Sequence, residues 1–181
     1  MGLAVLAVIV LLGVFLIAMY NSLVQLRVRS ESAWSDIDVQ LKRRHDLIPN
    51  LVETVQGYAT HEKDTFENIA KFRSLAMQAT GPVDKAAAEN QLSGALKSLF
   101  AVAENYPQLQ AAAEFTQLQN SLSEIEDAIQ NARRYYNAVV RDLNTKIQSF
   151  PTNILAGMFG FQQKQFFEAA AGDREPVAVK F

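Results

Sequence analysis

The chain begins with its most apolar stretch. Residues 2–20 are almost all Leu, Val, Ile and Ala, and no charged side chain occurs before Arg27. A helix of about 20 apolar residues spans the roughly 30 Å hydrocarbon core of a bilayer, so this pattern predicts a transmembrane helix, which we place within residues 1–26. The residues expected to hold this anchor in the membrane are Leu3, Val10 and Phe15 in the lipid and Tyr20 at its interface.

The anchor is expected to remain on the mature protein. A cleaved signal peptide carries basic residues before an apolar core of about 7 to 15 residues and ends in small residues. Here no Lys or Arg precedes the apolar run, the run is longer, and Met19, Tyr20 and Asn21 form a poor cleavage site. Basic residues stay in the cytoplasm, so Arg27 and Arg29 predict a single-pass protein with its N-terminus outside and its bulk cytoplasmic.

After residue 20, apolar residues recur at steps of three and four, and no stretch alternates apolar and polar residues for long enough to indicate a strand. The predicted fold class is all-α: the transmembrane helix continues into an elongated antiparallel bundle of about four helices, the first being the one linked to the anchor. The bundle is expected over residues 27–150, followed by a C-terminal tail over residues 151–181.

The first helix should carry one buried stripe, formed by Leu23, Leu26, Ser30, Ala33, Ile37, Leu41, Arg44 and Ile48. Pro49 lacks the amide that would bond to His45, so the chain is expected to kink or restart there. The pattern then predicts a second helix over residues 49–79, a third from about residue 83 to 106, and a fourth of about 40 residues that ends at Phe150.

Composition excludes several kinds of chemistry. The 17 basic and 19 acidic residues nearly cancel, which gives no electrostatic case for nucleic acid. There is no Cys, and the two histidines, His45 and His61, are expected on solvated helix surfaces. No glycine-rich phosphate loop or G-x-S-x-G motif occurs. We therefore predict no catalytic residue, cofactor or metal, and a protein that is not an enzyme.

Charged residues also fall on or beside the apolar stripes, notably Arg44, Arg73 and Arg134. A buried charge must be paired or hydrogen-bonded. We interpret these arginines as a structural polar layer that fixes helix register, or as side chains whose stems lie along the core while their charged ends reach water. The alternative is a recognition or proton-handling layer inside the bundle.

The tail is rich in phenylalanine, since six of the eleven Phe residues follow residue 149. Packing on the bundle explains this composition, and so does contact with a partner or with the lipid interface. The candidate contact residues are Met158, Phe159, Phe161, Phe166 and Phe167.

Several motifs resemble the LemA family, above all the block from Ala33-Trp34-Ser35-Asp36 to Pro49-Asn50-Leu51-Val52-Glu53. Further matches are Gly57-Tyr58, Glu104-Asn105-Tyr106-Pro107, Ala132-Arg133-Arg134-Tyr135-Tyr136-Asn137 and Phe150-Pro151. The resemblance implies a bacterial protein of the cell (inner) membrane, with one N-terminal helix and an antiparallel helical bundle. It implies no catalytic residues; related proteins occur in magnetosome formation, and a membrane protease is among the expected partners.

Two functions remain open at this point. The first is a non-enzymatic scaffold in the cell envelope that forms a homo-oligomer, through coiled-coil-like helices, and engages lipid or other membrane proteins. The second is a membrane-linked sensor that binds a small ligand within the bundle. An internal pocket lined by arginines without acidic partners would favour the sensor.

Overall fold

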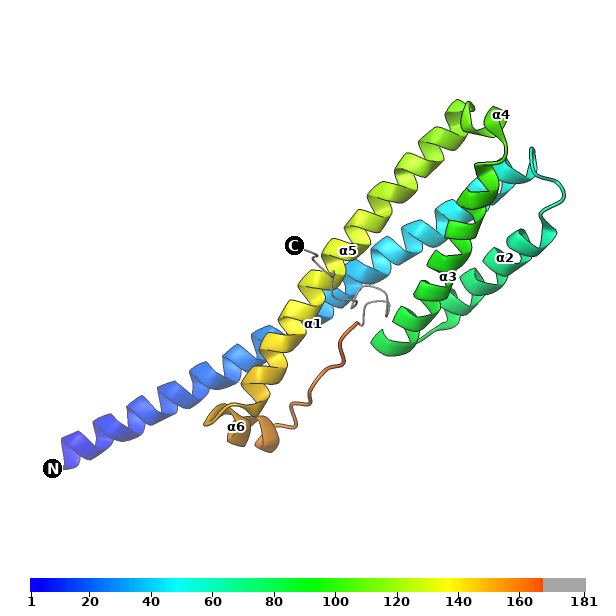
Figure 1. The fold of residues 1–181 in the computed structure, drawn as a ribbon. Coiled ribbons are helices and arrows are strands. Elements are labelled where there is room, and N and C mark those ends of the chain that lie inside the picture. The colour runs from blue at the N-terminus through cyan, green and yellow to red at the C-terminus, as the bar shows by residue number, and fades with distance from the viewer. Residues whose placement is uncertain (168–181) are drawn as a thin grey trace, which may run out of the picture. The chain divides into compact units, whose positions relative to one another are not determined.

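The computed structural model describes residues 1–167, and within this range every regular element is helical. The helices are α1 (Gly2–Gln56), α2 (Lys63–Gln78), α3 (Pro82–Ala103), α4 (Pro107–Gln110), α5 (Ala113–Gln148) and α6 (Thr152–Met158) (Figure 1). The predicted all-α fold with a long apolar N-terminal helix is confirmed.

The chain forms two compact units, and the predicted bundle range of residues 27–150 contributes to both. Unit 1 contains Met1–Asp36 and Ala132–Phe166, and unit 2 contains Ile37–Asn131 together with Phe167. Helices α1 and α5 each supply one part to each unit.

The expected restart of the helix at Pro49 is wrong, because α1 runs through this residue and ends at Gln56. The carbonyl that Pro49 cannot bond, that of His45, accepts a hydrogen bond of 2.8 Å from the Nε of Arg73. The break occurs instead in the turn between α1 and α2, which contains Gly57 and Thr60. The predicted second helix is therefore divided, and its first turns belong to α1.

Unit 2 contains, in sequence, the end of α1, α2, α3, the short α4 and the beginning of α5. Short connections force neighbouring segments to run antiparallel. In the turn before α3, Gly81 takes a positive φ of 79° and Pro82 occupies the first turn of the helix, where a missing amide costs nothing. Figure 1 shows α2 and α3 side by side. The core of this unit includes Ile48, Leu51, Val55, Phe66, Ile69, Leu92, Leu96, Leu99, Phe115 and Leu122.

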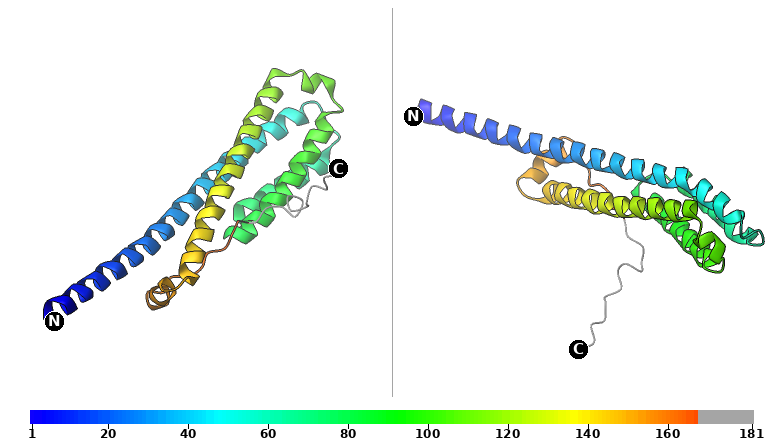
Figure 2. Two further views of the ribbon diagram at one scale, coloured as in Figure 1. Left: turned by 60° about the vertical axis from the view of Figure 1, so that its left-hand side comes forward. Right: turned by 90° about the horizontal axis from the view of Figure 1, so that it is seen from above.

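Unit 1 pairs the first part of α1 with the second part of α5, which lie side by side in both views of Figure 2. Leu23, Leu143 and Ala156 form its buried cluster. Trp34 packs against Tyr136 with their ring centroids 5.4 Å apart. The buried stripe predicted for α1 is confirmed: seven of its eight residues are buried, and Leu26 is partly buried.

A left-handed turn folds the chain back after α6. Gly160 has φ of 68°, and the amide of Phe161 donates to the carbonyl of Ala156 over 2.9 Å. The amide of Gly160 donates to the carbonyl of Gly157, so the end of α6 is a Schellman motif, in which a positive φ favours glycine. The motif returns Phe161 to the cluster that contains Ala156.

Candidate functional site

The apolar segment of α1 is exposed except at Gly13, which is partly buried, and Met19, which is buried. Residues 1–12 are all exposed, and only 6% of its most apolar 18-residue window is buried. Leu3, Val10 and Phe15 are 86%, 56% and 52% exposed. A core helix of a soluble protein would bury such residues, because apolar surface in water is unfavourable. This helix is long and apolar enough to cross a membrane.

Tyr20 joins the end of that segment to the tail. Its ring lies 4.8 Å from the ring of Phe159 and 5.9 Å from that of Phe161, measured between centroids, and both pairs are edge-on. Arg27 lies over the Phe161 ring at 5.3 Å from its centroid. Edge-on aromatic pairs and cation–π contacts are both favourable, so they fix the tail against α1.

The other tail candidates divide into exposed and buried residues. Met158 is 75% exposed, Phe159 is 56% exposed and Phe166 is 41% exposed, whereas Phe167 is 1% exposed. Phe161 is partly buried against the unit 1 cluster. The remainder of the predicted tail, residues 168–181, lies outside the described residues.

The segment after α6 is held along α5 by an amide side chain. Asn144 donates from Nδ2 to the carbonyl of Lys164 and accepts the amide of Lys164, both over 2.9 Å. The hydroxyl of Tyr136 donates to the carbonyl of Gln165 over 2.9 Å. Burial raises the pKa of the Tyr136 hydroxyl above its ordinary value of 10.0.

Arg44 belongs to a buried charged cluster in unit 2. Its Nη1 lies 3.1 Å from a carboxylate oxygen of Glu89, and its Nη2 donates to Ser93 over 2.6 Å. Its Nε lies 2.9 Å from the carboxylate of Glu126, close enough for an ion pair although the N–H is not directed at the oxygen. Arg44 is only 2% exposed, so these acids offset the cost of burying the guanidinium.

The expectation that His45 is a solvated surface residue is wrong. His45 is 6% exposed, and its Nε2 lies 2.8 Å from the second carboxylate oxygen of Glu89. The position follows Leu41 by four residues and precedes Ile48 by three, so it shares their buried face. His61 is exposed, as expected.

The three candidate arginines are not brought together in one cluster. Arg73, in unit 2, is partly buried and donates to the backbone of His45. Arg134 belongs to unit 1 and is exposed, because the buried face of α5 there is formed by Tyr136, Val139 and Val140. Arg44 is the fully buried member, and it has acidic partners.

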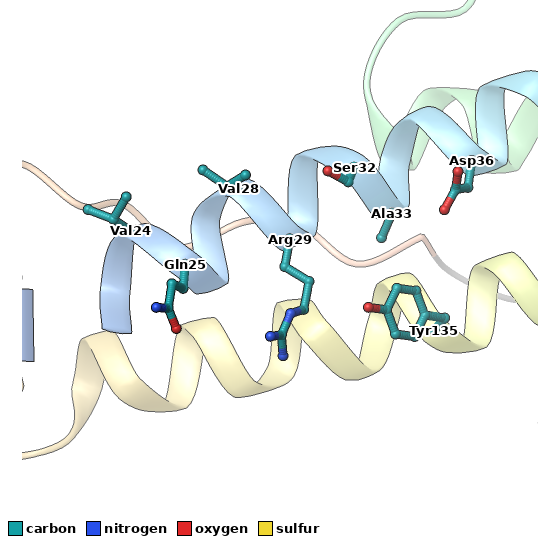
Figure 3. Close-up of a pocket in the computed structure, with 8 residues that line it drawn as sticks. All are labelled: Val24, Gln25, Val28, Arg29, Ser32, Ala33, Asp36 and Tyr135. Carbon is teal, nitrogen blue, oxygen red and sulfur yellow. The ribbon is translucent and has the colours of Figure 1, made fainter. Parts of the chain in front are cut away.

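An open groove of about 460 Å³ runs along unit 1. Figure 3 shows seven of its residues on α1 and Tyr135 on α5, with the Arg29 side chain extending toward α5. Arg29 and Asp36 are its charged lining residues, and Val24, Val28 and Ala33 are among its apolar ones.

Neither the groove nor the charged cluster forms a metal site. Groups of three or more His, Asp or Glu side chains placed to hold a metal are absent from residues 1–167.

On the exposed side of α1, Lys42 donates to Asp46 over 2.9 Å, and this hydrogen bond lowers the pKa of the Asp46 carboxyl.

Comparison with known proteins identifies relatives of this chain. A sequence model described as the LemA family matches residues 33–181. The magnetosome protein MamQ 2 of Paramagnetospirillum magneticum is 28% identical over 96% of this chain and 73% of its own length. The magnetosome protein MamQ of Magnetospirillum gryphiswaldense is 27% identical over 87% of this chain and 68% of its length. Protein LemA of Metamycoplasma hominis is 29% identical, with coverage of 87% and 72%. Because the family model covers most of the sequence, the chain belongs to the LemA family.

Proposed function

We propose that this protein is a non-enzymatic, membrane-anchored helical scaffold of the bacterial cell envelope. It self-associates and engages other membrane proteins or lipid. The observation that carries the proposal is the exposed apolar segment of α1, which continues as one helix, without a break, into the packed part of the chain.

The contacts at the end of this segment support an anchor that stays attached. Met19 is buried, and Tyr20 packs against Phe159 and Phe161. Cleavage after Tyr20 would remove these contacts from unit 1. The segment therefore contributes to the folded protein as well as to its targeting.

A scaffold is also supported by what surrounds the buried charges. Arg44 is paired with Glu89 and Glu126, which leaves its positive charge no need of an anionic ligand. Three relatives are named as magnetosome proteins, and those names refer to a cellular structure and to no reaction. Both observations favour a structural role over a ligand sensor or an enzyme.

The flanking charges supply the orientation. Arg27 and Arg29 follow the apolar segment, and basic residues are retained on the cytoplasmic side. We place the N-terminus outside the inner membrane and the two packed units in the cytoplasm. Fused to the C-terminus, a reporter that works only in the cytoplasm should be active, and a reporter that works only outside the inner membrane should be inactive.

Alkaline extraction of membranes tests the anchor. The wild-type chain should stay in the membrane pellet with its N-terminal segment intact by mass spectrometry. The double variant Val8→Arg/Leu12→Arg should move to the soluble fraction, because each arginine at mid-span costs about 2.5 to 3.5 kcal/mol on insertion scales. Val39→Arg/Met77→Arg replaces two exposed apolar residues of unit 2 and serves as the control.

A wild-type chain that is released by alkali, or a mature protein that begins near Asn21, would contradict the anchor. Self-association is tested separately by the mass of the full chain in nanodiscs of fixed size. A particle that holds a single copy at every protein-to-disc ratio would contradict that part of the proposal.

A further inference from the structure

The chain has two long segments without charge, and the structure brings them together. One is residues 1–26, and the other is residues 147–163, which lie between Lys146 and Lys164. They meet where the ring of Tyr20 packs edge-on against the rings of Phe159 and Phe161. The second segment therefore lies beside the end of the first.

Helix α6 in this second segment is apolar on two opposite sides. Its inner side is buried, with Leu155 8% and Ala156 1% exposed. Its outer side carries Ile154 and Met158, four residues apart, and the exposed Phe150 lies just before the helix. These three residues are 56%, 75% and 81% exposed. The inner side of α6 is already buried by the protein, so its outer apolar side is left exposed.

The depth of this outer side follows from α1. If Leu3 to Ile17 lies in hydrocarbon, Tyr20 lies at the interface, where tyrosine is enriched. The Phe159 ring, in edge-on contact with Tyr20, then lies at the same depth. The helix contains no charged residue, and its polar side chains are Thr152, which is buried, and Asn153.

Basic groups stand just beyond this level. Lys146 donates to the hydroxyl of Ser22 over 2.6 Å, and Ser22 is about 3 Å farther along α1 than Tyr20. Arg27, which lies over the Phe161 ring, is about 10 Å beyond Tyr20. Amphipathic interfacial segments place apolar side chains among the acyl chains and basic groups among the phosphates, and this arrangement has both.

We propose that an apolar patch at α6 inserts into the interfacial layer of the bilayer; it is formed by Ile154 and Met158 on the outer side of the helix and by Phe150 and Phe159, which flank the helix. It gives the protein a second contact with lipid besides the spanning helix. We assign lipid as the partner of this patch because the patch adjoins the membrane-spanning segment at Tyr20. The basic groups of Lys146 and Arg27 lie farther from the hydrocarbon than the patch does. This inference rests on the proposed anchor, since the depth is counted from it.

A second contact beside a single helix has a mechanical consequence. A lone spanning helix can tilt and rotate in the bilayer. Insertion of α6 at one side of α1 fixes the rotation of unit 1 about the anchor, so unit 1 presents a constant face to its neighbours in the membrane.

Spin labels test the depth directly, and the absence of cysteine makes single-site labelling simple. Ile154→Cys and Met158→Cys carry the label at exposed positions, so the packing of unit 1 is retained. Leu11→Cys reports hydrocarbon, and Ser98→Cys, exposed on α3, reports water. The full chain is reconstituted in vesicles of phosphatidylethanolamine and phosphatidylglycerol, and collisions with oxygen and with a water-soluble nickel chelate are measured.

Labels at residues 154 and 158 should collide more with oxygen and less with the nickel chelate than the label at residue 98. Their ratio of oxygen to nickel collision rates should approach the ratio at residue 11. A label at residue 158 that matches residue 98, while residue 11 reports hydrocarbon, overturns the α6 contact and leaves the anchor intact. A label shielded from both reagents overturns it in favour of a protein covering. Water exposure at residue 11 as well would instead refute the proposed anchor. Unchanged helical circular dichroism confirms that each labelled chain is folded.

Discussion

The Nε of Arg73 donates a hydrogen bond of 2.8 Å to the carbonyl oxygen of His45. That carbonyl lies four residues before Pro49, and a residue with an amide at position 49 would bond it within the helix. Arg73 on α2 thus supplies the donor that α1 lacks at its proline. This bond explains how α1 continues to Gln56 and why a charged residue lies on the inner side of α2.

We expect Arg73→Met to lower the free energy of unfolding by about 1 to 3 kcal/mol, because the His45 carbonyl loses its donor. In a Pro49→Ala background the same change should cost markedly less, since the alanine amide then donates to that carbonyl. The four proteins form a double-mutant cycle, measured by urea unfolding of the full chain in detergent, followed by circular dichroism. An equal cost of Arg73→Met in both backgrounds would show that its role is unrelated to the proline.

Arg44 should be far more sensitive than its neighbour in the sequence. Arg44→Met leaves the Glu89 carboxylate buried without its guanidinium partner, and breaking a buried ion pair costs about 3 to 5 kcal/mol. Arg43 is exposed and donates to Gln40, so Arg43→Met is the matched control, with an expected cost within about 0.5 kcal/mol. Comparable losses of unfolding free energy in the two variants would refute the structural role assigned to the buried cluster.

The two glycines at the end of α6 should respond in opposite directions to alanine. Gly160 has a positive φ, so Gly160→Ala should cost roughly 1 to 2 kcal/mol, even though the added Cβ meets no atom within 4 Å. Gly157 lies within the helix with equally open space, so Gly157→Ala should stabilise the helix by up to about 1 kcal/mol. Thermal unfolding of both variants decides this, and a neutral Gly160→Ala would mean that the Schellman turn does not hold Phe161 in place.

Periodicity was sufficient to identify most of the fold. The steps of three and four from Leu23 to Ile48 correspond to buried positions, because a helix buries one stripe whatever it packs against. The continuation of α1 through Pro49 was not predictable in this way. Local rules assign proline a helix break, and they cannot see a donor that comes from Arg73 on another helix.

The candidate site was predictable only in its local parts. Tyr20 was identified as an interfacial residue from its place after the apolar run. Its contact with Phe159 was not, since residues so far apart in the sequence meet only through the packing of α5 and α6. The same limit applies to His45 and Glu89: the sequence placed His45 on a solvated surface, and the partner that holds it in the interior lies on α3.

Tyr136 gives the protein a specific sensitivity to alkali. Burial raises the pKa of its hydroxyl in the folded state above the unfolded value of about 10. Between these two values the folded state keeps a proton that the unfolded state has lost. Stability from this group is therefore complete below about pH 10 and decreases as the pH rises toward the folded-state pKa.

Tyr136→Phe removes this titration together with the hydrogen bond to the Gln165 carbonyl. At neutral pH the variant should be less stable by about 0.5 to 1.5 kcal/mol, the net value of one such bond. As the pH rises above about 10, the difference should shrink, because only the wild type bears the cost of burying a phenolate. Urea unfolding at a series of pH values, with Tyr135→Phe as a control at an exposed position, measures the difference. If the stability difference between wild type and Tyr136→Phe stays constant up to about pH 11, Tyr136 has the same pKa in the folded and unfolded states, contrary to the effect expected of its burial.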